Sequence, residues 1–231
     1  LVPGGPFLSE KAISPAATKA LEAKYGLDKP MAERYFTYIS DAAHGDFGDS
    51  LKQRGRTVMD IIATKFPVSA RLGGMAVVLA LCVGVPLGVL AAYKRGTFID
   101  SLFSVIATCG IAVPGFVICT LLLYVFGVKL QWLPTLGLKN AQSYIMPVVA
   151  LAAYPTSYIM RLMRSSMLDV LGQDYMRTAK AKGLSQKVSL FKHALRNAIL
   201  PVITYVGPML AYTLTGSFVT EKIFTIPGLG G

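Results

Sequence analysis

The sequence predicts an all-α protein: a polytopic transmembrane helical bundle that follows a helical region outside the membrane. Hydrophobic residues make up 53% of its 231 residues and charged residues only 15%, whereas a soluble domain carries about 25% charge. Four long apolar runs follow residue 66, and basic residues gather between them. Composition and pattern together indicate a chain that crosses a bilayer several times.

Residues 1–66 are predicted to form an extracytoplasmic helical region. They hold nine Lys/Arg and eight Asp/Glu residues, so they are nearly neutral. Ser14-Pro15 and Asp28-Lys29-Pro30 are sequences typical of helix starts. An apolar stripe at four-residue spacing follows the second start, at Met31, Tyr35 and Ile39.

Thr57 and Asp60 have the spacing of a capping box, which predicts a third, short helix. Its apolar positions suit a helix that lies on the bilayer surface, and Pro67 is predicted to open the first span.

Residues 67–231 are predicted to form the transmembrane domain. Its spans are expected at about 67–93, 98–128, 144–164 and 199–220, each long enough to cross the hydrocarbon core. The second run is interrupted by Pro114-Gly115, which a membrane helix tolerates when neighbouring groups satisfy the freed backbone. A loop at about 165–198 separates the last two spans.

The basic residues predict the orientation of these spans. Lys94 and Arg95 form a short basic turn, and residues 161–196 hold eight Lys/Arg against two acids, a net charge of +6. Both segments are expected on the cytoplasmic side, because loops rich in Lys and Arg stay there. Alternation then places the 129–143 loop and residues 1–66 outside.

The long basic loop has internal order. Gln173 to Lys182 is predicted to form a short helix that ends at Gly183. Ser185 can cap a second helix, with an apolar stripe at Val188, Phe191, Leu195 and Ile199. A short helix displayed on a loop suits docking into a groove of a soluble partner. A basic loop that only sets topology is the alternative.

Two motifs in this loop carry a family resemblance. Arg177-Thr178-Ala179-Lys180-Ala181-Lys182-Gly183-Leu184 and the later His193-Ala194-Leu195-Arg196-Asn197-Ala198-Ile199-Leu200-Pro201 resemble the loop signature of ABC importer permeases. More narrowly, they resemble the dipeptide/oligopeptide/nickel permease family. Arg177-Thr178-Ala179 stands where the usual motif has Glu-Ala-Ala, and fourteen residues separate Gly183 from Ala198. The longer spacing is similar to that of the peptide branch.

The resemblance extends along nearly the whole chain. His44–Gly48 and Phe66–Ala70 most resemble the first permease subunit of oligopeptide importers, and Thr215–Glu221 with Ile226–Gly230 resembles the end of the family's fifth span. By this comparison the family's first and last spans are expected to lie outside the given sequence.

The resemblance implies a permease half of an ABC importer for oligopeptides or dipeptides, located in a bacterial or archaeal cytoplasmic membrane. It implies a second homologous permease subunit, two cytoplasmic ATPase subunits that hold ATP and Mg, an extracytoplasmic peptide-binding protein and the lipid bilayer as partners. This chain is expected to bind no cofactor or metal and to be no enzyme, since it has no GxxxxGK[ST] loop. The residues expected to couple to the ATPases are Asp174, Tyr175, Arg177, Thr178, Ala179, Ala181, Lys182, Gly183 and Leu184.

Polar or helix-breaking residues inside the spans are candidates for the pathway: Ser104, Thr108, Pro114, Ser157, Tyr158, Tyr212, Thr215 and Ser217. The alternative for each Ser or Thr is a hydrogen bond to its own helix backbone or packing against a neighbouring helix.

A gradient-driven secondary transporter is the main alternative to this interpretation. Such a transporter would be expected to carry ionisable residues or repeats inside its spans, and the four runs are nearly free of them. ABC importers of nickel, glutathione or sugar remain open among the relatives. Nucleic-acid binding is excluded, because the basic residues lie between apolar runs rather than in one patch.

Overall fold

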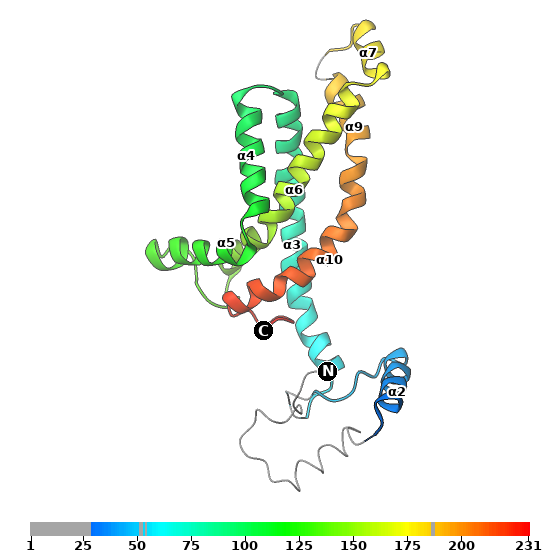
Figure 1. The fold of residues 1–231 in the computed structure, drawn as a ribbon. Helices are drawn as coiled ribbons and strands as arrows, with labels where there is room; N and C mark the ends of the chain where they lie inside the picture. Colours follow the sequence, from blue (N-terminus) through cyan, green and yellow to red (C-terminus); the bar gives the residue numbers. More distant parts are fainter. Residues whose placement is uncertain (1–28, 51–52, 54, 186–187) are drawn as a thin grey trace. The chain divides into compact units, whose positions relative to one another are not determined.

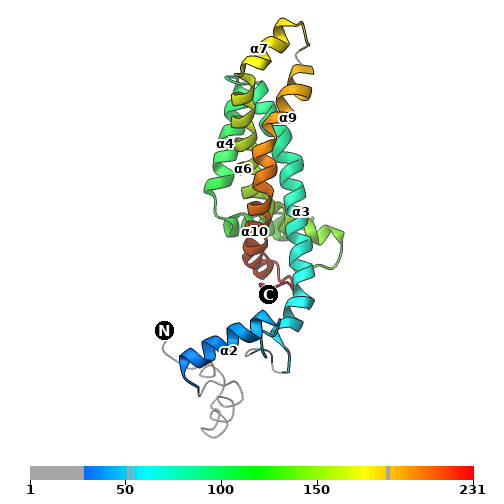
Figure 2. The same cartoon turned by 90° about the vertical axis from the view of Figure 1, so that its right-hand side faces the viewer.

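A computed structural model describes residues 29–50, 53, 55–185 and 188–231 (Figures 1 and 2). Contacts divide the chain into two compact units between Thr64 and Lys65, and each unit is described by itself. Regular structure in the described residues is helical, and a single isolated bridge pairs Asp49 with Thr57. The all-α class is confirmed, while the helix predicted from Ser14-Pro15 lies outside the described residues.

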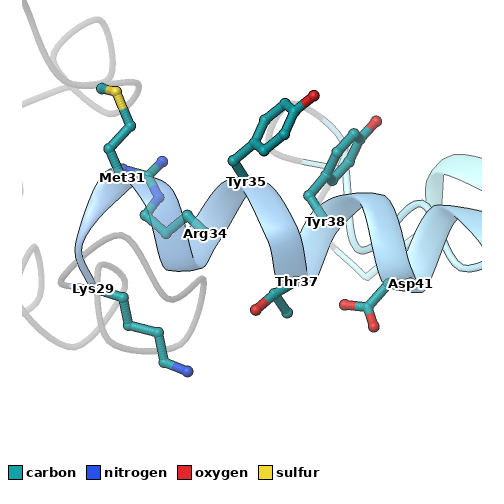
Figure 3. Close-up of a pocket in the computed structure, with 7 residues that line it drawn as sticks. All are labelled: Lys29, Met31, Arg34, Tyr35, Thr37, Tyr38 and Asp41. Carbon is teal, nitrogen blue, oxygen red and sulfur yellow. The ribbon is translucent and has the colours of Figure 1, made fainter.

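The first unit contains helix α2 (Met31–Ala43), which begins after Pro30 as predicted and is followed by His44. The apolar stripe of Met31, Tyr35 and Ile39 is exposed. Figure 3 shows Met31, Tyr35 and Tyr38 projecting from one side of α2, beside a hollow of about 490 Å³. The stripe therefore exists, but no described residue buries it.

Helix α3 (Val58–Tyr93) corrects one prediction. Its capping box is present: the Asp60 N–H donates to Thr57 Oγ1 over 3.1 Å, and the Thr57 N–H donates to Asp60 Oδ2 over 3.4 Å. The helix continues through Pro67 for 36 residues, so the expected short surface helix and first span are one element. A proline removes one backbone hydrogen bond, but its φ is close to the helical value, so a long apolar helix can include it.

The second unit is a bundle in which α6 packs against α4, α5 and α10. Its α3–α4 turn and α7 lie at one end, whereas α5 and the segment after α10 lie at the other (Figures 1 and 2). The two basic segments thus share one end, as the charge pattern predicts. The elements after α3 are α4 (Phe98–Ala112), α5 (Gly115–Leu122), η1 (Leu123–Lys129), η2 (Ala141–Tyr144), α6 (Ile145–Leu171), α7 (Asp174–Ala181), η3 (Ser189–Ala194), α9 (Leu195–Ala198) and α10 (Leu200–Ile223).

Three described helices are long and apolar enough to cross a membrane: Val58–Tyr93, Ala141–Leu171 and Leu200–Ile223. The span expected at 98–128 is instead a helix pair bent by 102°. Val113, which precedes Pro114, takes an extended conformation with ψ of 122°, because a proline ring disfavours the helical region for the residue before it. At fifteen residues, α4 is only about 22 Å long.

Two buried clusters hold the bundle together. The cluster toward the α7 end joins α3, α6, α7, η3 and α10 through residues such as Val89, Met167, Met176 and Val202. The cluster at the other end joins α3, α5 and α6 to Phe224 and Ile226 after α10. There the Leu229 N–H donates to Ser69 Oγ over 3.0 Å, and the Gly230 N–H donates to the buried Glu221 carboxylate over 2.8 Å.

Candidate functional site

The predicted loop at 165–198 is shorter than expected, because helices extend into it from both sides. Helix α6 continues to Leu171, and η3 with α9 covers 189–198. Between them lies α7 (Asp174–Ala181), the short helix that the pattern predicts from Gln173 to Lys182. Gly183 follows it with a φ of +76°, a left-handed conformation typical of a helix C-terminus.

Helix α7 has one face against the bundle and one face free in the described chain. Met176 and Ala179 are buried, and Met176 belongs to the cluster that includes Met167 and Leu190. Ala179 thus faces the bundle, whereas Ala181 is exposed. The other coupling residues are exposed: Asp174, Tyr175, Arg177, Thr178, Ala181, Lys182, Gly183 and Leu184.

Polar contacts hold the base of this segment. Asn197 Nδ2 donates to the Tyr175 hydroxyl over 3.1 Å and to the His193 carbonyl over 3.1 Å. Ser166 Oγ donates to the Ala198 carbonyl over 2.8 Å, which joins α6 to the end of α9. The base is therefore held to α6 and α9, so that α7 projects from a supported position.

The second helix of the loop corrects the predicted stripe. Ser185 caps it, since the Val188 N–H donates to Ser185 Oγ over 3.4 Å. The buried apolar residues are Leu190, Ala194 and Ala198, whereas Val188 and Phe191 are exposed. Residues 189–194 form a π-helix, whose wider turn places residues about four to five apart on one face. Leu195 and Ile199 of the predicted stripe pack against the buried cluster, so the three- and four-residue pattern is correct for these two positions and wrong for Val188 and Phe191.

An ion pair that the sequence pattern does not reveal lies at the α7 end of the bundle, between Asp100 and Arg164. Arg164 Nε is 2.6 Å from Asp100 Oδ1, and its NH2 group is 2.8 Å from Oδ2. The side chain of Asp100 is 8% exposed and that of Arg164 30%. The pair joins α4 to α6 by a two-point contact, the geometry that an arginine fork forms with a carboxylate.

The pathway candidates lie in different surroundings. Ser157 and Ser217 are buried between helices. Thr108 and Thr215 donate to carbonyls of their own helices, those of Ser104 and Ala211, over 2.8 and 3.0 Å, as the alternative for each Thr expects. Pro114 is at the bend between α4 and α5.

Two further candidates, Tyr158 and Tyr212, belong to a larger cluster that the sequence did not reveal. Tyr158 stacks on Tyr205 with ring centroids 4.4 Å apart, and Tyr154 lies 6.4 Å from Tyr158 and 4.9 Å from Tyr212. The spacing of Tyr154 and Tyr158 on one helix was visible in the sequence. Their partners on α10 were not, because pairing depends on how α6 and α10 cross.

No group of three or more His, Cys, Asp or Glu side chains within the described ranges is arranged to hold a metal ion. The second unit consists of long apolar helices with α7 packed against them at one end.

Comparison with known proteins agrees with this geometry. The oligopeptide transport system permease protein OppB of Salmonella typhimurium is 44% identical over 100% of this chain and 76% of its own length. The dipeptide transport system permease protein DppB of Bacillus subtilis is 46% identical over 100% of this chain and 75% of its own. The fold is similar to that of the MetNI methionine ABC transporter in inward-facing conformations, with a TM-score of 0.60 and 18% identity over 74% of this chain and 78% of that one.

The family described as binding-protein-dependent transport system inner membrane component matches residues 84–231. That range includes α6, α7 and α10, with the coupling candidates and the tyrosine cluster. From this match and the similarity to the two permeases, the chain belongs to the family of binding-protein-dependent transport system inner membrane components.

Proposed function

We propose that this chain forms half of the translocation pathway of an ABC importer for oligopeptides or dipeptides and couples ATPase closure to outward opening. Helix α7 carries this proposal: it is a short helix held against a membrane bundle on one face and exposed on the other. Such a helix fits into a groove of a soluble partner. The peptide substrate is supported by the names of the OppB and DppB relatives.

The exposed face of α7 is the proposed contact with the ATPase subunit. Asp174, Tyr175, Arg177, Thr178 and Ala181 would meet the partner, while Met176 and Ala179 stay against the bundle. The turn at Lys182, Gly183 and Leu184 would end the contact. A movement of the ATPase would then reach α6 and α10 through the packed base of the segment.

The proposed assembly has five protein parts. A second homologous permease subunit completes the pathway, two ATPase subunits hold ATP and Mg on the cytoplasmic side, and a peptide-binding protein delivers substrate from outside. This chain would bind no nucleotide itself. The assembly would lie in the cytoplasmic membrane of a bacterium or archaeon, and the family description supports an inner-membrane location.

The test is co-purification of the full-length protein with its neighbouring candidate subunits, followed by ATPase assays with and without peptide-loaded binding protein. Stimulated hydrolysis and uptake are expected, and both should fall when the exposed residues of α7 are scrambled while Met176 and Ala179 are kept. A protein that purifies alone and moves solute without ATPases would contradict the proposal.

A further inference from the structure

Four tyrosines form a continuous aromatic strip across two membrane-spanning helices. Tyr154 and Tyr158 come from α6, and Tyr205 and Tyr212 come from α10. Each ring lies within 6.4 Å, centroid to centroid, of another member of the strip. We refer to these four residues as the tyrosine strip.

The strip is on the surface of the second unit rather than in its core. Tyr158 is 36% exposed and Tyr212 is 48% exposed, and the other two rings are half-buried. None of the four hydroxyls has a hydrogen-bond partner in the part of the chain that the structure describes. An unpaired hydroxyl facing hydrocarbon is unfavourable, so this surface needs a partner that offers polar groups.

Other surfaces of the same helices suit lipid better. Leu200, Ile203 and Leu210 on α10 are exposed and wholly apolar, and they can face acyl chains without losing a hydrogen bond. Two kinds of exposed face therefore exist on α10, and the tyrosine strip is the amphipathic one.

A cavity continues from the strip toward the α5 end of the bundle. It has a volume of about 330 Å³ and lies at the bend between α4 and α5, with Tyr154 and Tyr212 in its wall. Pro114, Phe116 and Leu151 line it as well. The strip and the cavity thus form one surface that runs along α6 and α10, with tyrosines shared between them.

The chemistry of this surface fits a peptide better than a charged or purely apolar solute. Tyrosine offers an apolar ring face to a side chain of any kind and a hydroxyl to a backbone amide. Its ring face also attracts a cation such as a peptide's terminal ammonium. A charged residue in the strip would select side chains by their charge, and the strip has none.

We propose that the tyrosine strip contacts the main chain and N-terminal ammonium of the peptide during passage. The proposal rests on the proposed function. The hydroxyls of Tyr158 and Tyr212 donate to peptide carbonyls, and the rings of all four residues cover the side chains without selecting among them.

The direct test replaces single tyrosines with p-benzoylphenylalanine in the full-length permease, assembled with its partners in proteoliposomes. Probes at Tyr158 and Tyr212 are expected to cross-link a radiolabelled tripeptide only when ATP and loaded binding protein are present. Tyr124 is the matched control, an exposed tyrosine on η1 outside the strip, and a probe there should capture no peptide.

A second measurement removes only the hydroxyls. Tyr158→Phe combined with Tyr212→Phe should lower uptake at limiting peptide by at least roughly twofold, because each lost hydrogen bond alone accounts for roughly two- to tenfold. Tyr124→Phe should leave uptake unchanged.

The outcomes separate this proposal from the proposed function. Probes that capture the second permease subunit or lipid, and never peptide, would overturn the strip as a peptide contact, as would unchanged uptake in the double variant. Failure of the unsubstituted assembly to take up peptide with ATP would instead overturn the proposed function.

Discussion

Gly183 holds a left-handed backbone at the end of α7, with a φ of +76°, and an added Cβ would meet no atom within 4 Å. Gly183→Ala is therefore strained by conformation rather than by space, at a cost of about 1 kcal/mol. We expect Gly183→Ala to lower uptake per ATP hydrolysed by displacing the end of α7. Gly183→Asn should retain more coupling, because Asn tolerates this conformation.

Gly172→Ala serves as the control, since Gly172 has a helical φ of −80° and its added Cβ would make only ordinary contacts. Equal effects of Gly183→Ala and Gly183→Asn would contradict a conformational role for Gly183.

Gly88 lets α3 and α6 approach closely. An added Cβ would lie 2.6 Å from the Met160 carbonyl oxygen and 2.7 Å from Met163 Cβ. Gly88→Ala should thus lower the stability of the purified protein by about 1–3 kcal/mol, as overpacking does. Gly74→Ala on the same helix should cause no loss, because nothing lies within 4 Å of its Cβ. Thermal unfolding in detergent measures both variants, and equal melting temperatures would contradict the close approach.

These two glycines differ in what the sequence could predict. Gly183 ends a short polar helix, so its role follows from local pattern alone. Gly88 lies in an apolar run, and only the position of α6 reveals why a side chain cannot fit there. Local conformation was predictable at single residues, whereas contact between distant segments was not.

At the scale of elements, Met176 anchors α7 to the bundle. Its side chain is fully buried in the cluster with Met167 and Leu190. An eight-residue helix is too short to be stable alone, so Met176→Ala should increase amide hydrogen exchange across 174–181. The loss of a buried methionine costs about 2–5 kcal/mol in general.

Met75→Ala is the control for this prediction, because Met75 is exposed on α3. Unchanged exchange across α7 in Met176→Ala would show that the contact does not hold the helix.

The Asp100–Arg164 pair joins two elements at the α7 end. Asp100→Asn leaves Arg164 without its carboxylate, and we expect a loss of about 1–3 kcal/mol in unfolding free energy. The double variant Asp100→Asn with Arg164→Gln should lose less unfolding free energy than the sum of the losses in the two single variants, because the pair acts as a unit. Glu33→Gln removes an exposed ion pair on α2 and should have little effect. Additive losses at Asp100 and Arg164 would contradict the coupling between them.

Element boundaries show where sequence patterns fail. Three apolar runs correspond to helices of about the predicted extent, because burial in lipid requires a minimum length. The second run is two helices bent by 102° at Pro114, an angle that the sequence does not give because it depends on which groups satisfy the freed backbone. The π-helix at 189–194 likewise moved the buried face to Leu190 and Ala194, a shift that no regular period contains.

At the scale of the whole molecule, the family and the proposed peptide-contacting surface differ in how much of them the sequence reveals. The family resemblance depends on motifs such as Arg177–Leu184, which are local in the sequence and can be recognised without knowing the fold. The proposed peptide-contacting surface depends on α6 and α10 together, and only two of its four tyrosines, Tyr158 and Tyr212, were among the predicted pathway residues. A single sequence does not reveal which side chains of one helix contact side chains of another.

Orientation in the membrane leads to the last prediction. Arg95 is exposed in the α3–α4 turn at the α7 end. Lys139 is exposed in the loop at the opposite end, where the Gly137 N–H donates to the Phe224 carbonyl over 2.8 Å. The excess of basic residues at the α7 end predicts that this end is cytoplasmic.

A membrane-impermeant maleimide tests this orientation in intact cells, with Cys82, Cys109 and Cys119 of the full-length protein replaced by alanine. Lys139→Cys is expected to react from outside, whereas Arg95→Cys should react only after the cells are permeabilised. Permeabilised cells, in which both variants should react, control for accessibility. Labelling of Arg95→Cys alone in intact cells would reverse the orientation and place α7 away from any cytoplasmic ATPase. Labelling of both from outside would contradict the bundle itself, because the two positions lie at opposite ends of it.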